Sequence, residues 1–254
     1  MTTPLSDNTL DYQIFGAGVR AFTTRRTIGR DPEWLCRTLH IDERHLVIPH
    51  QTHQDTVRII DETFTDLPLQ VRKERLEGVD AVMTNLAGTC IGVSTADCIP
   101  VLLYDPEHAA AAAVHAGWRG TVRRIVQKTI AAMAHTYGTR PEALLAAIGP
   151  GISIDNFEVG DEVYEAFLGE GFDMNRIAAR YPDRHATGST KWHLDIVECN
   201  RLQLTAAGVP AESIDVANIC TYDNNHLFFS ARREQKGDTK CGRNFNAIIT
   251  RPQP

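Results

Sequence analysis

Between residues 81 and 114 the sequence consists of short apolar runs, and this feature limits the possible folds most. The runs cover Ala81–Thr84, Cys90–Thr95, Val101–Tyr104 and Ala109–Val114. Their length and their bounding polar residues are typical of strands. The sequence Asp-Pro-Glu-His at 105–108 is typical of a turn and predicts a hairpin between the last two strands.

The rest of the chain alternates predicted strands and helices. A proline after Asp31 predicts a helix start, and apolar residues at three- and four-residue spacing predict a helix over Thr121–His135. Residues 62–78 are polar and are expected to be rich in loops. Further helices are expected at Glu158–Leu168 and Leu194–Ala207, and further strands at Tyr12–Phe15, Val19–Thr23, Leu46–Pro49, Thr56–Ile60, Leu144–Ile148, Ile214–Cys220, Leu227–Ala231 and Asn246–Thr250.

This alternation predicts a mixed α/β fold with antiparallel and packed sheets. No composition shift or Pro/Gly/Ser-rich linker divides the 254 residues, so we expect a single domain over 1–254.

The composition indicates which classes of partner the protein can bind. The formal net charge is −6, from 26 Lys+Arg against 32 Asp+Glu, so we expect no nucleic-acid partner. The N-terminal residues lack the pattern of a signal peptide, and the most apolar window is too short to span a bilayer. The six cysteines form no CxxC pair and are expected to be reduced thiols. We therefore expect a cytoplasmic protein without a membrane partner. The oligomeric state stays open.

Two reactive side chains stand at the ends of the apolar runs, where chemistry is more common than in strand interiors. Cys98 and His115 hold these positions, and the segment His-Gln-Thr-His upstream supplies His50 and His53. If three strands converge, His53, Cys98 and His115 form a metal site. Three protein ligands with one open position are typical of catalytic zinc, whose bound water ionises near pH 7. The alternative is that Cys98 packs as a small apolar residue and the histidines are structural.

Neighbouring residues offer further candidates. Asp97 is a candidate to orient a ligand or to act as a general acid or base, or else to cap a turn. Arg119 lies in the segment His-Ala-Gly-Trp-Arg-Gly, ahead of a predicted helix, where exposed amides and a guanidinium attract anions. The alternative there is a plain strand-to-helix turn with Trp118 in the core. Arg232, which follows a predicted strand, is either an anion binder or a solvated strand end.

Five segments together resemble the YfiH-like, laccase-domain family, also called polyphenol oxidase or multicopper oxidase. They are H-Q-T-H, T-A-D-C-I-P-V-L-L-Y-D, V-H-A-G-W-R-G-T, A-I-G-P-G-I and F-S-A-R-R. The similarity runs from about residue 14 to residue 250. It departs from the family pattern in the segments after Thr23 and after Arg233, so substrate contacts from these segments are not carried over.

The resemblance implies a single-domain α/β/β/α-type sandwich and a metal triad at His53, Cys98 and His115. Family members are described as purine nucleoside phosphorylases for adenosine, inosine and S-methyl-5'-thioadenosine, with adenosine deaminase activity and a reported phenol-oxidising activity. The resemblance also maps family arginines onto Arg119 and Arg232. It thus implies small-molecule partners, namely purine nucleosides and phosphate, and a Zn²⁺ cofactor, with Cu²⁺ as the alternative.

The resemblance and the candidate residues together leave four functions open. The first is nucleoside phosphorolysis, in which Arg119 and Arg232 bind phosphate. The second is copper-dependent polyphenol oxidation, although none of the four methionines is close in sequence to the candidate ligands. The third is a cysteine hydrolase in which His115 activates Cys98. The fourth is a binding module without catalytic activity.

Overall fold

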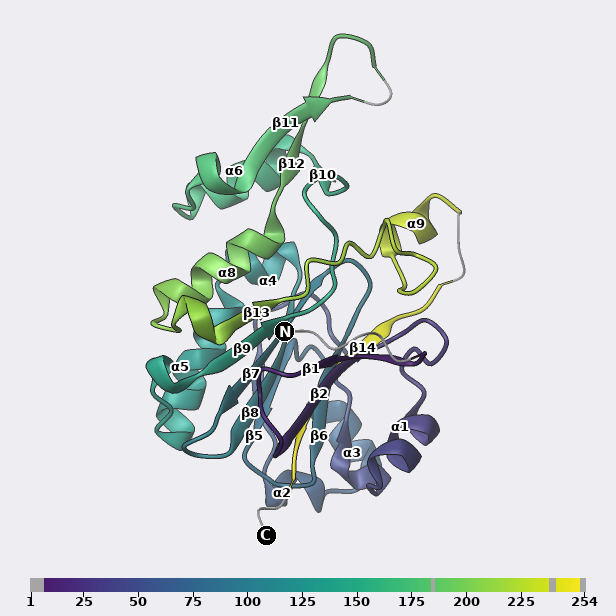
Figure 1. Cartoon of the computed structure of the whole chain (residues 1–254), viewed down its shortest axis with the longest axis vertical. Coiled ribbons are helices and arrows are strands. Elements are labelled where there is room, and N and C mark those ends of the chain that lie inside the picture. The colour runs from purple at the N-terminus through teal and green to yellow at the C-terminus, as the bar shows by residue number, and fades with distance from the viewer. Residues whose placement is uncertain (1–6, 184–185, 238–240, 252–254) are drawn as a thin grey trace.

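Two large β-sheets lie face to face in the computed structural model, which describes residues 7–183, 186–237 and 241–251 (Figure 1). The larger sheet has the strand order β13-β9-β7-β8-β5-β4, and the smaller has the order β1-β2-β14-β6-β3. We call them the six-stranded and the five-stranded sheet. The mixed α/β fold expected from the sequence is therefore confirmed.

The six-stranded sheet contains the apolar runs that stand out in the sequence. β7 and β8 pair antiparallel from Ile99↔Ala116 to Asp105↔Ala110, which confirms the predicted hairpin. Side chains alternate, so that Val101 faces a helix layer whereas Leu102 faces the other sheet. The strands are β4 (Val57–Ile59), β5 (Ala81–Thr84), β7 (Ile99–Asp105), β8 (Ala110–Ala116), β9 (Leu145–Ile148) and β13 (Ile214–Val216).

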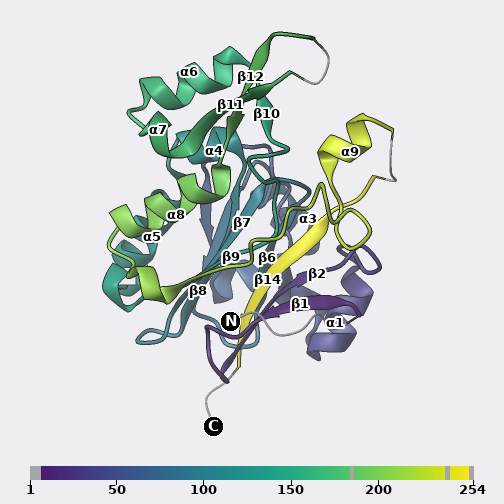
Figure 2. The same ribbon diagram turned by 45° about the horizontal axis from the view of Figure 1, so that its top comes forward.

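The five-stranded sheet joins the two ends of the chain. The C-terminal strand β14 pairs antiparallel with both β2 and β6, so it lies inside the sheet rather than at its edge (Figure 2). The segment before β14 is thereby carried to the end of the sandwich where β7 begins. The strands are β1 (Thr9–Tyr12), β2 (Val19–Thr24), β3 (Leu46–Val47), β6 (Cys90–Thr95) and β14 (Asn244–Thr250).

Helices cover the outer faces of both sheets. α5 (Ile125–Tyr137) and α8 (Ile196–Ala206) pack on the six-stranded sheet, and α1 (Pro32–Leu39) packs on the five-stranded sheet through Leu35. The layers are therefore α/β/β/α. None of the described helices has the length and apolar character needed to cross a bilayer. Short helical turns connect the layers at η1 (Glu43–His45), η2 (Pro141–Ala143) and η3 (Ala211–Ser213).

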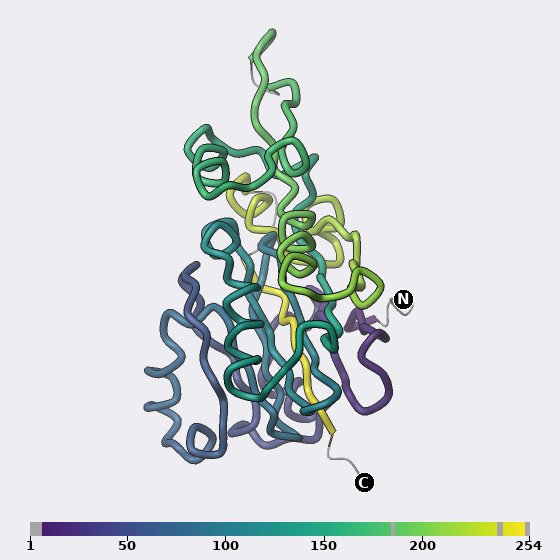
Figure 3. Tube along the Cα trace, turned by 90° about the vertical axis from the view of Figure 1, so that its left-hand side faces the viewer, coloured from purple at the N-terminus to yellow at the C-terminus, as the bar shows by residue number. Residues whose placement is uncertain are grey.

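A third, small sheet projects from the sandwich, as the tube in Figure 3 shows. It comprises β10 (Glu158–Val159), β12 (Thr190–Leu194) and β11 (Ala178–Pro182), and it packs against α6 (Asp161–Gly169) and α7 (Met174–Ile177) around Phe167. The sequence pattern predicts only the helix here. Neither longer strand alternates between buried and exposed residues: β11 has no buried residue, and β12 is exposed at its first two residues and buried at its last two.

Two predicted elements are divided or absent. The helix expected over Thr121–His135 is two helices, α4 (Trp118–Val122) and α5, because Arg124 adopts a left-handed conformation with φ of 62°. The strand expected at Leu227–Ala231 is wrong, because the Ser230 side chain accepts a hydrogen bond from the Arg233 amide and caps α9 (Ala231–Gln235).

The segment 62–78 is more ordered than its polarity indicates. It contains α2 (Glu62–Thr65) and α3 (Leu69–Arg75). Asp61 caps α2, since its side chain accepts a hydrogen bond from the Phe64 amide. The buried Phe64 then fixes this polar segment to the core between the sheets.

Gly92 provides a test of the packing in the five-stranded sheet. A Cβ added there would lie 2.4 Å from Phe245 Cζ and 2.7 Å from the Asn246 carbonyl oxygen. Since a backbone atom cannot move away easily, we expect Gly92→Ala to lower the free energy of unfolding by about 1–3 kcal/mol. Urea unfolding measures this. Gly18→Ala is the control, because a Cβ at Gly18 meets nothing within 4 Å; equal midpoints for both variants would contradict the prediction.

Candidate metal centre

The structure brings His53, Cys98 and His115 together at one end of the sandwich. In the β7–β8 register Pro100 pairs with His115, so Cys98 and His115 stand at the same sheet end. His53 comes from the loop between β3 and β4. One ligand atom from each residue lies within 4.8 Å of the other two. The convergence of strand ends expected from the sequence is therefore observed.

Gly117 leaves room for this group. A Cβ at this position would lie 3.1 Å from Cys98 Sγ and 3.1 Å from His53 Cδ2. Almost any other residue would therefore displace at least one of the three side chains. The glycine of the His-Ala-Gly-Trp segment thus has a steric role beside the cluster, in addition to starting α4.

Asp80, which is fully buried, holds the loop that carries His53. Its carboxylate accepts hydrogen bonds from the amides of Thr52 (3.2 Å), His53 (3.0 Å) and Gln54 (2.8 Å). His53 has a left-handed φ of 62°, which is costly for a residue with a side chain. The three hydrogen bonds offset that cost and set the direction in which the His53 ring leaves the backbone.

Asp80 also orients His115. The His115 ring Nδ1 lies 2.7 Å from Asp80 Oδ1, and the His115 amide donates to the Asp80 carbonyl at 2.8 Å. With Nδ1 donating to the carboxylate, Nε2 is the ring atom left to bind a metal. A carboxylate behind a histidine is a common arrangement at metal sites because it fixes the tautomer and raises the basicity of the ligand.

The cluster favours the charged forms of Cys98 and His115. Burial alone would raise the pKa of Cys98, but the His115 charge and hydrogen bonds from both imidazoles lower it to about 6. Burial likewise opposes protonation of His115, yet Cys98 and Asp80 raise its pKa to about 9. The metal-free protein therefore pairs a thiolate with an imidazolium, and a metal ion would replace the imidazolium proton.

The cluster opens into a cavity of about 660 Å³, within the size range of small-molecule sites. The cavity lies where the loop after β3, the start of β7 and the segment before β14 meet. Its lining residues are Arg30, Pro49, His50, Gln51, His53, Ser94, Ala96, Cys98, His115, Ala231, Gln235, Cys241, Gly242 and Arg243.

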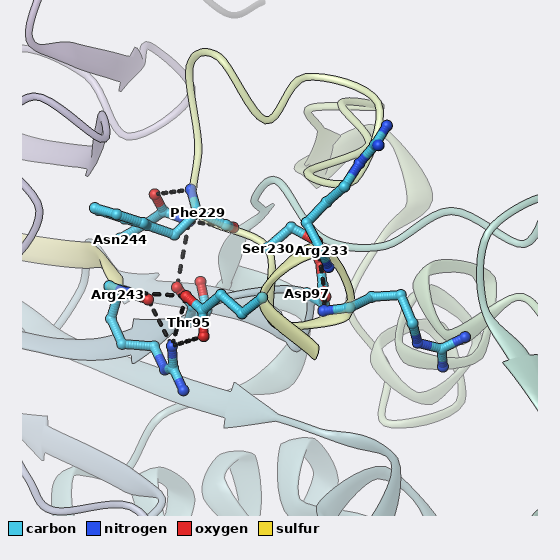
Figure 4. A network of polar contacts seen from close by, with 10 residues as sticks. Thr95, Asp97, Phe229, Ser230, Arg233, Arg243 and Asn244 are labelled. Carbon is cyan, nitrogen blue, oxygen red and sulfur yellow. Dashed lines mark hydrogen bonds and ion pairs between the residues drawn. The ribbon is translucent and has the colours of Figure 1, made fainter. Parts of the chain in front are cut away.

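The Asp97 side chain points towards Ser230 in the C-terminal segment (Figure 4). Its carboxylate accepts hydrogen bonds from Thr221 Oγ1 (2.6 Å), Ser230 Oγ (3.0 Å) and the Arg232 amide (2.7 Å). Asp97 has φ of 82°, so it occupies a tight turn beside Cys98. This placement favours the turn-capping alternative over a role as general acid or base.

Neither arginine expected to bind phosphate lines the cavity. Arg119 is exposed, and its guanidinium stacks over Trp118 with 4.2 Å between the Arg119 Cζ and the ring centroid. Arg232 donates to the carbonyl oxygens of Glu158 (3.0 Å) and Asn156 (3.4 Å), beside the small sheet. Arg232 therefore lies outside the described lining of this cavity, and its binding of phosphate stays a prediction.

Sequence reasoning missed Asp80, Arg30 and Arg243. Asp80 had a signal, because a carboxylate directly before a buried strand must find hydrogen-bond donors. The two arginines lie in the segments where the sequence departs from the family pattern, and nothing in their local sequence separates them from solvated surface arginines. Only the tertiary fold brings them to the same cavity.

The chain is similar to known proteins over most of its length. A family model described as multi-copper polyphenol oxidoreductase laccase matches residues 8–251. A purine nucleoside phosphorylase of Bacteroides thetaiotaomicron is 50% identical over 188 residues, which cover 74% of this chain and 68% of that protein. Adenosine deaminase RL5, of an unknown prokaryotic organism, is 44% identical over 214 residues, with coverage of 84% and 78%. The crystal structure of YlmD from Geobacillus stearothermophilus superposes with a TM-score of 0.82 at 26% identity, covering 99% of each chain.

Asp80→Asn tests the support of the cluster. The amide cannot accept all four hydrogen bonds, and it no longer balances a charged His115. We expect the affinity for Zn²⁺ to fall about 10- to 100-fold. Competition with a chromophoric chelator measures this affinity. Asp61→Asn is the control, because Asp61 also accepts backbone hydrogen bonds but lies at the cap of α2; an equal loss in the control would contradict the prediction.

In the metal-free protein, we expect the effect of Asp80→Asn on stability to depend on pH. Burial raises the pKa of Asp80, but hydrogen bonds from His115, Gln54 and Thr52 lower it below its ordinary value. The folded state therefore favours the carboxylate, whose stabilisation is complete above about pH 4 and disappears as pH falls through the folded-state pKa. We expect the urea midpoints of wild type and Asp80→Asn to differ at pH 7 and to converge as the pH falls through the folded-state pKa of Asp80. A gap that widens in acid would contradict this assignment.

Proposed function

The chain belongs to the family described as multi-copper polyphenol oxidoreductase laccase, and from this premise we propose that it is a purine nucleoside phosphorylase. Its substrates are adenosine, inosine and S-methyl-5'-thioadenosine, which inorganic phosphate cleaves to a free base and a (methylthio)ribose 1-phosphate. The observation that carries the proposal is the cavity of about 660 Å³ that opens onto His53, Cys98 and His115. Two relatives of this chain are named purine nucleoside phosphorylase, which supports the same activity.

His53, Cys98 and His115 would hold the metal, which we propose to be Zn²⁺. Two imidazoles and one thiolate suit zinc, and Gly117 and Asp80 preserve their arrangement. Bound zinc supplies Lewis acidity at the cavity. A blue-copper site adds a weak axial ligand, usually methionine, and no methionine is among the described residues that line this cavity.

The reaction needs little covalent chemistry from the chain. A phosphate oxygen forms a bond to C1' of the ribose, the bond from C1' to the purine nitrogen breaks, and the base leaves with the bonding electrons and takes up a proton. The cavity would hold phosphate and nucleoside in the relative position that the reaction needs. It would also limit the access of water, which would otherwise hydrolyse the nucleoside.

Adenosine deamination is a second candidate, because a relative 44% identical to this chain is named adenosine deaminase. Deamination and phosphorolysis both require a bound purine nucleoside. We therefore propose that the same cavity supports deamination as a side activity.

Two alternatives remain testable. The Asp80–His115–Cys98 series resembles the base-and-nucleophile arrangement of cysteine hydrolases, and the lowered pKa of Cys98 suits a nucleophile. Phenol oxidation is the activity in the family description. Both differ from phosphorolysis in what they require, since a hydrolase needs neither metal nor phosphate and an oxidase needs copper.

The decisive assay compares inosine cleavage with and without inorganic phosphate, in wild type and in Cys98→Ala. We expect cleavage to require phosphate, and the substitution to reduce kcat/KM by at least about 100-fold, because one metal ligand is lost. Cys36→Ala is the matched control, since this partly buried cysteine packs against the outer face of the five-stranded sheet. Equal turnover with and without phosphate would refute the proposal.

Metal removal separates phosphorolysis from the thiol alternative. We expect chelation to abolish turnover and Zn²⁺ to restore it without any change in the circular-dichroism spectrum. Activity that survives complete metal removal would instead identify Cys98 as the nucleophile. Phenol oxidation that appears only after copper loading would assign the oxidase activity to the metal supplied.

A further inference from the structure

Apart from the Cys98 thiolate, the ionisable side chains that line the cavity beside the candidate metal ligands are basic or belong to exposed Cys241. Among its described lining residues none is an aspartate or a glutamate, whereas two arginines and three histidines are present. The arginines are Arg30 and Arg243. The two guanidinium groups give the cavity a positive potential, which favours an anionic ligand.

The carboxylates of this region lie behind the basic groups rather than in the cavity. Asp80 bonds to His115, Glu77 bonds to His50 Nδ1 at 2.7 Å, and Glu234 bonds to Arg243. Each carboxylate engages one side of its partner. The other donors of these side chains are thereby left for a ligand, and the side chains are already fixed in direction.

Arg243 shows this most clearly. Its Nη1 donates to Glu234 Oε1 (3.2 Å) and Oε2 (3.1 Å) and to the Gly242 carbonyl (2.6 Å). No hydrogen bond from Nε or Nη2 is made within residues 7–183, 186–237 and 241–251. Glu234 is itself fixed, since it accepts the Gly242 amide at 2.8 Å. The guanidinium thus keeps two donors in a rigid fork beside the cavity.

Arg30 lines the same cavity but comes from the N-terminal part of the sequence. It follows Gly29, where a Cβ would lie 3.3 Å from the Arg243 carbonyl oxygen. The backbones that carry the two arginines are therefore adjacent. Arg30 is exposed, and its side chain forms no ion pair or hydrogen bond with the described part of the chain.

Ser94 supplies a neutral donor at the same cavity. Gln51 satisfies its backbone, donating to the carbonyl at 2.8 Å and accepting from the amide at 2.7 Å. Its hydroxyl is buried and has no hydrogen-bond partner among the residues described, and the side chain is only 9% exposed. The hydroxyl therefore keeps its donor and acceptor capacity for a ligand.

We infer that Arg30, Arg243 and Ser94 form the subsite for the phosphate co-substrate, beside the metal cluster; this inference rests on the proposed phosphorylase function. Two guanidinium groups match the charge of a phosphate dianion, and their planar forks suit its oxygens. In this inference Arg30 and Arg243, rather than Arg119 and Arg232, are the arginines that bind phosphate.

Steady-state kinetics with Arg30→Ala and Arg243→Ala test the inference. Phosphate is varied at saturating inosine, and inosine is varied at saturating phosphate. We expect the KM for phosphate to rise about 10- to 100-fold, because a hydrogen bond to a charged group is lost. The KM for inosine should change less than about twofold. Arg243→Lys, which keeps the charge but not the fork, should fall between wild type and Arg243→Ala.

Arg140→Ala is the matched control. Arg140 also pairs with a glutamate, Glu107, but it lies at the opposite end of β7. We expect its KM for phosphate to equal that of wild type. An unchanged KM for phosphate in folded Arg30→Ala and Arg243→Ala would overturn the inference, as would a rise in Arg119→Ala alone.

A binding measurement keeps the inference testable if Arg243→Ala folds poorly or if no phosphorolysis occurs. Inorganic phosphate should raise the Tm of wild type and of Arg140→Ala, and this shift should be absent in Arg30→Ala. A shift lost in Arg30→Ala together with phosphate-independent inosine turnover would support the anion subsite and refute the phosphorylase. An equal shift in all variants would overturn the subsite and leave the phosphorylase proposal to the assay above.

Discussion

The Asp80 carboxylate is the interaction on which the candidate metal centre depends. It accepts three backbone amides from the loop that carries His53 and one ring nitrogen from His115, which comes from a different strand. A buried carboxylate without such donors would be strongly destabilising. The same four hydrogen bonds that stabilise the charge therefore fix two of the three candidate ligands, and the loop between β3 and β4 is ordered because the strand order places Asp80 beneath it.

Much of the fold could be predicted because the apolar runs are strong local signals. The β7–β8 hairpin and the mixed α/β class follow from periodicity and turn chemistry, whereas the small sheet does not, since its strands are exposed and gain their order from packing around Phe167. The break at Arg124 also has no signal in the helical pattern, because a left-handed residue other than glycine depends on tertiary contacts. The single-domain assignment stays a prediction.

The residues of the site also fall into those that could be predicted from the sequence and those that could not. His53, Cys98 and His115 could be predicted to meet because residue type and strand-end position agree, and the resemblance to a family pointed to the same three residues. The two arginines that we propose bind phosphate could not be predicted from the sequence. Arg119 and Arg232 have the more suggestive local sequence, but Arg232 donates to two carbonyl groups and Arg119 stacks on an indole. Arg30 and Arg243 reach the cavity only because β14 inserts between β2 and β6.

Asp97 links the two halves of the cavity. It is adjacent to Cys98, and its carboxylate holds Ser230 and the Arg232 amide at the start of α9. α9 in turn carries Glu234, which fixes Arg243. A continuous series of hydrogen bonds therefore joins the turn beside a candidate metal ligand to the arginine that we propose binds phosphate. A reaction between two substrates needs their subsites held at a constant separation. In the proposed phosphorylase, Asp97 would provide that constraint through its hydrogen bonds within the chain.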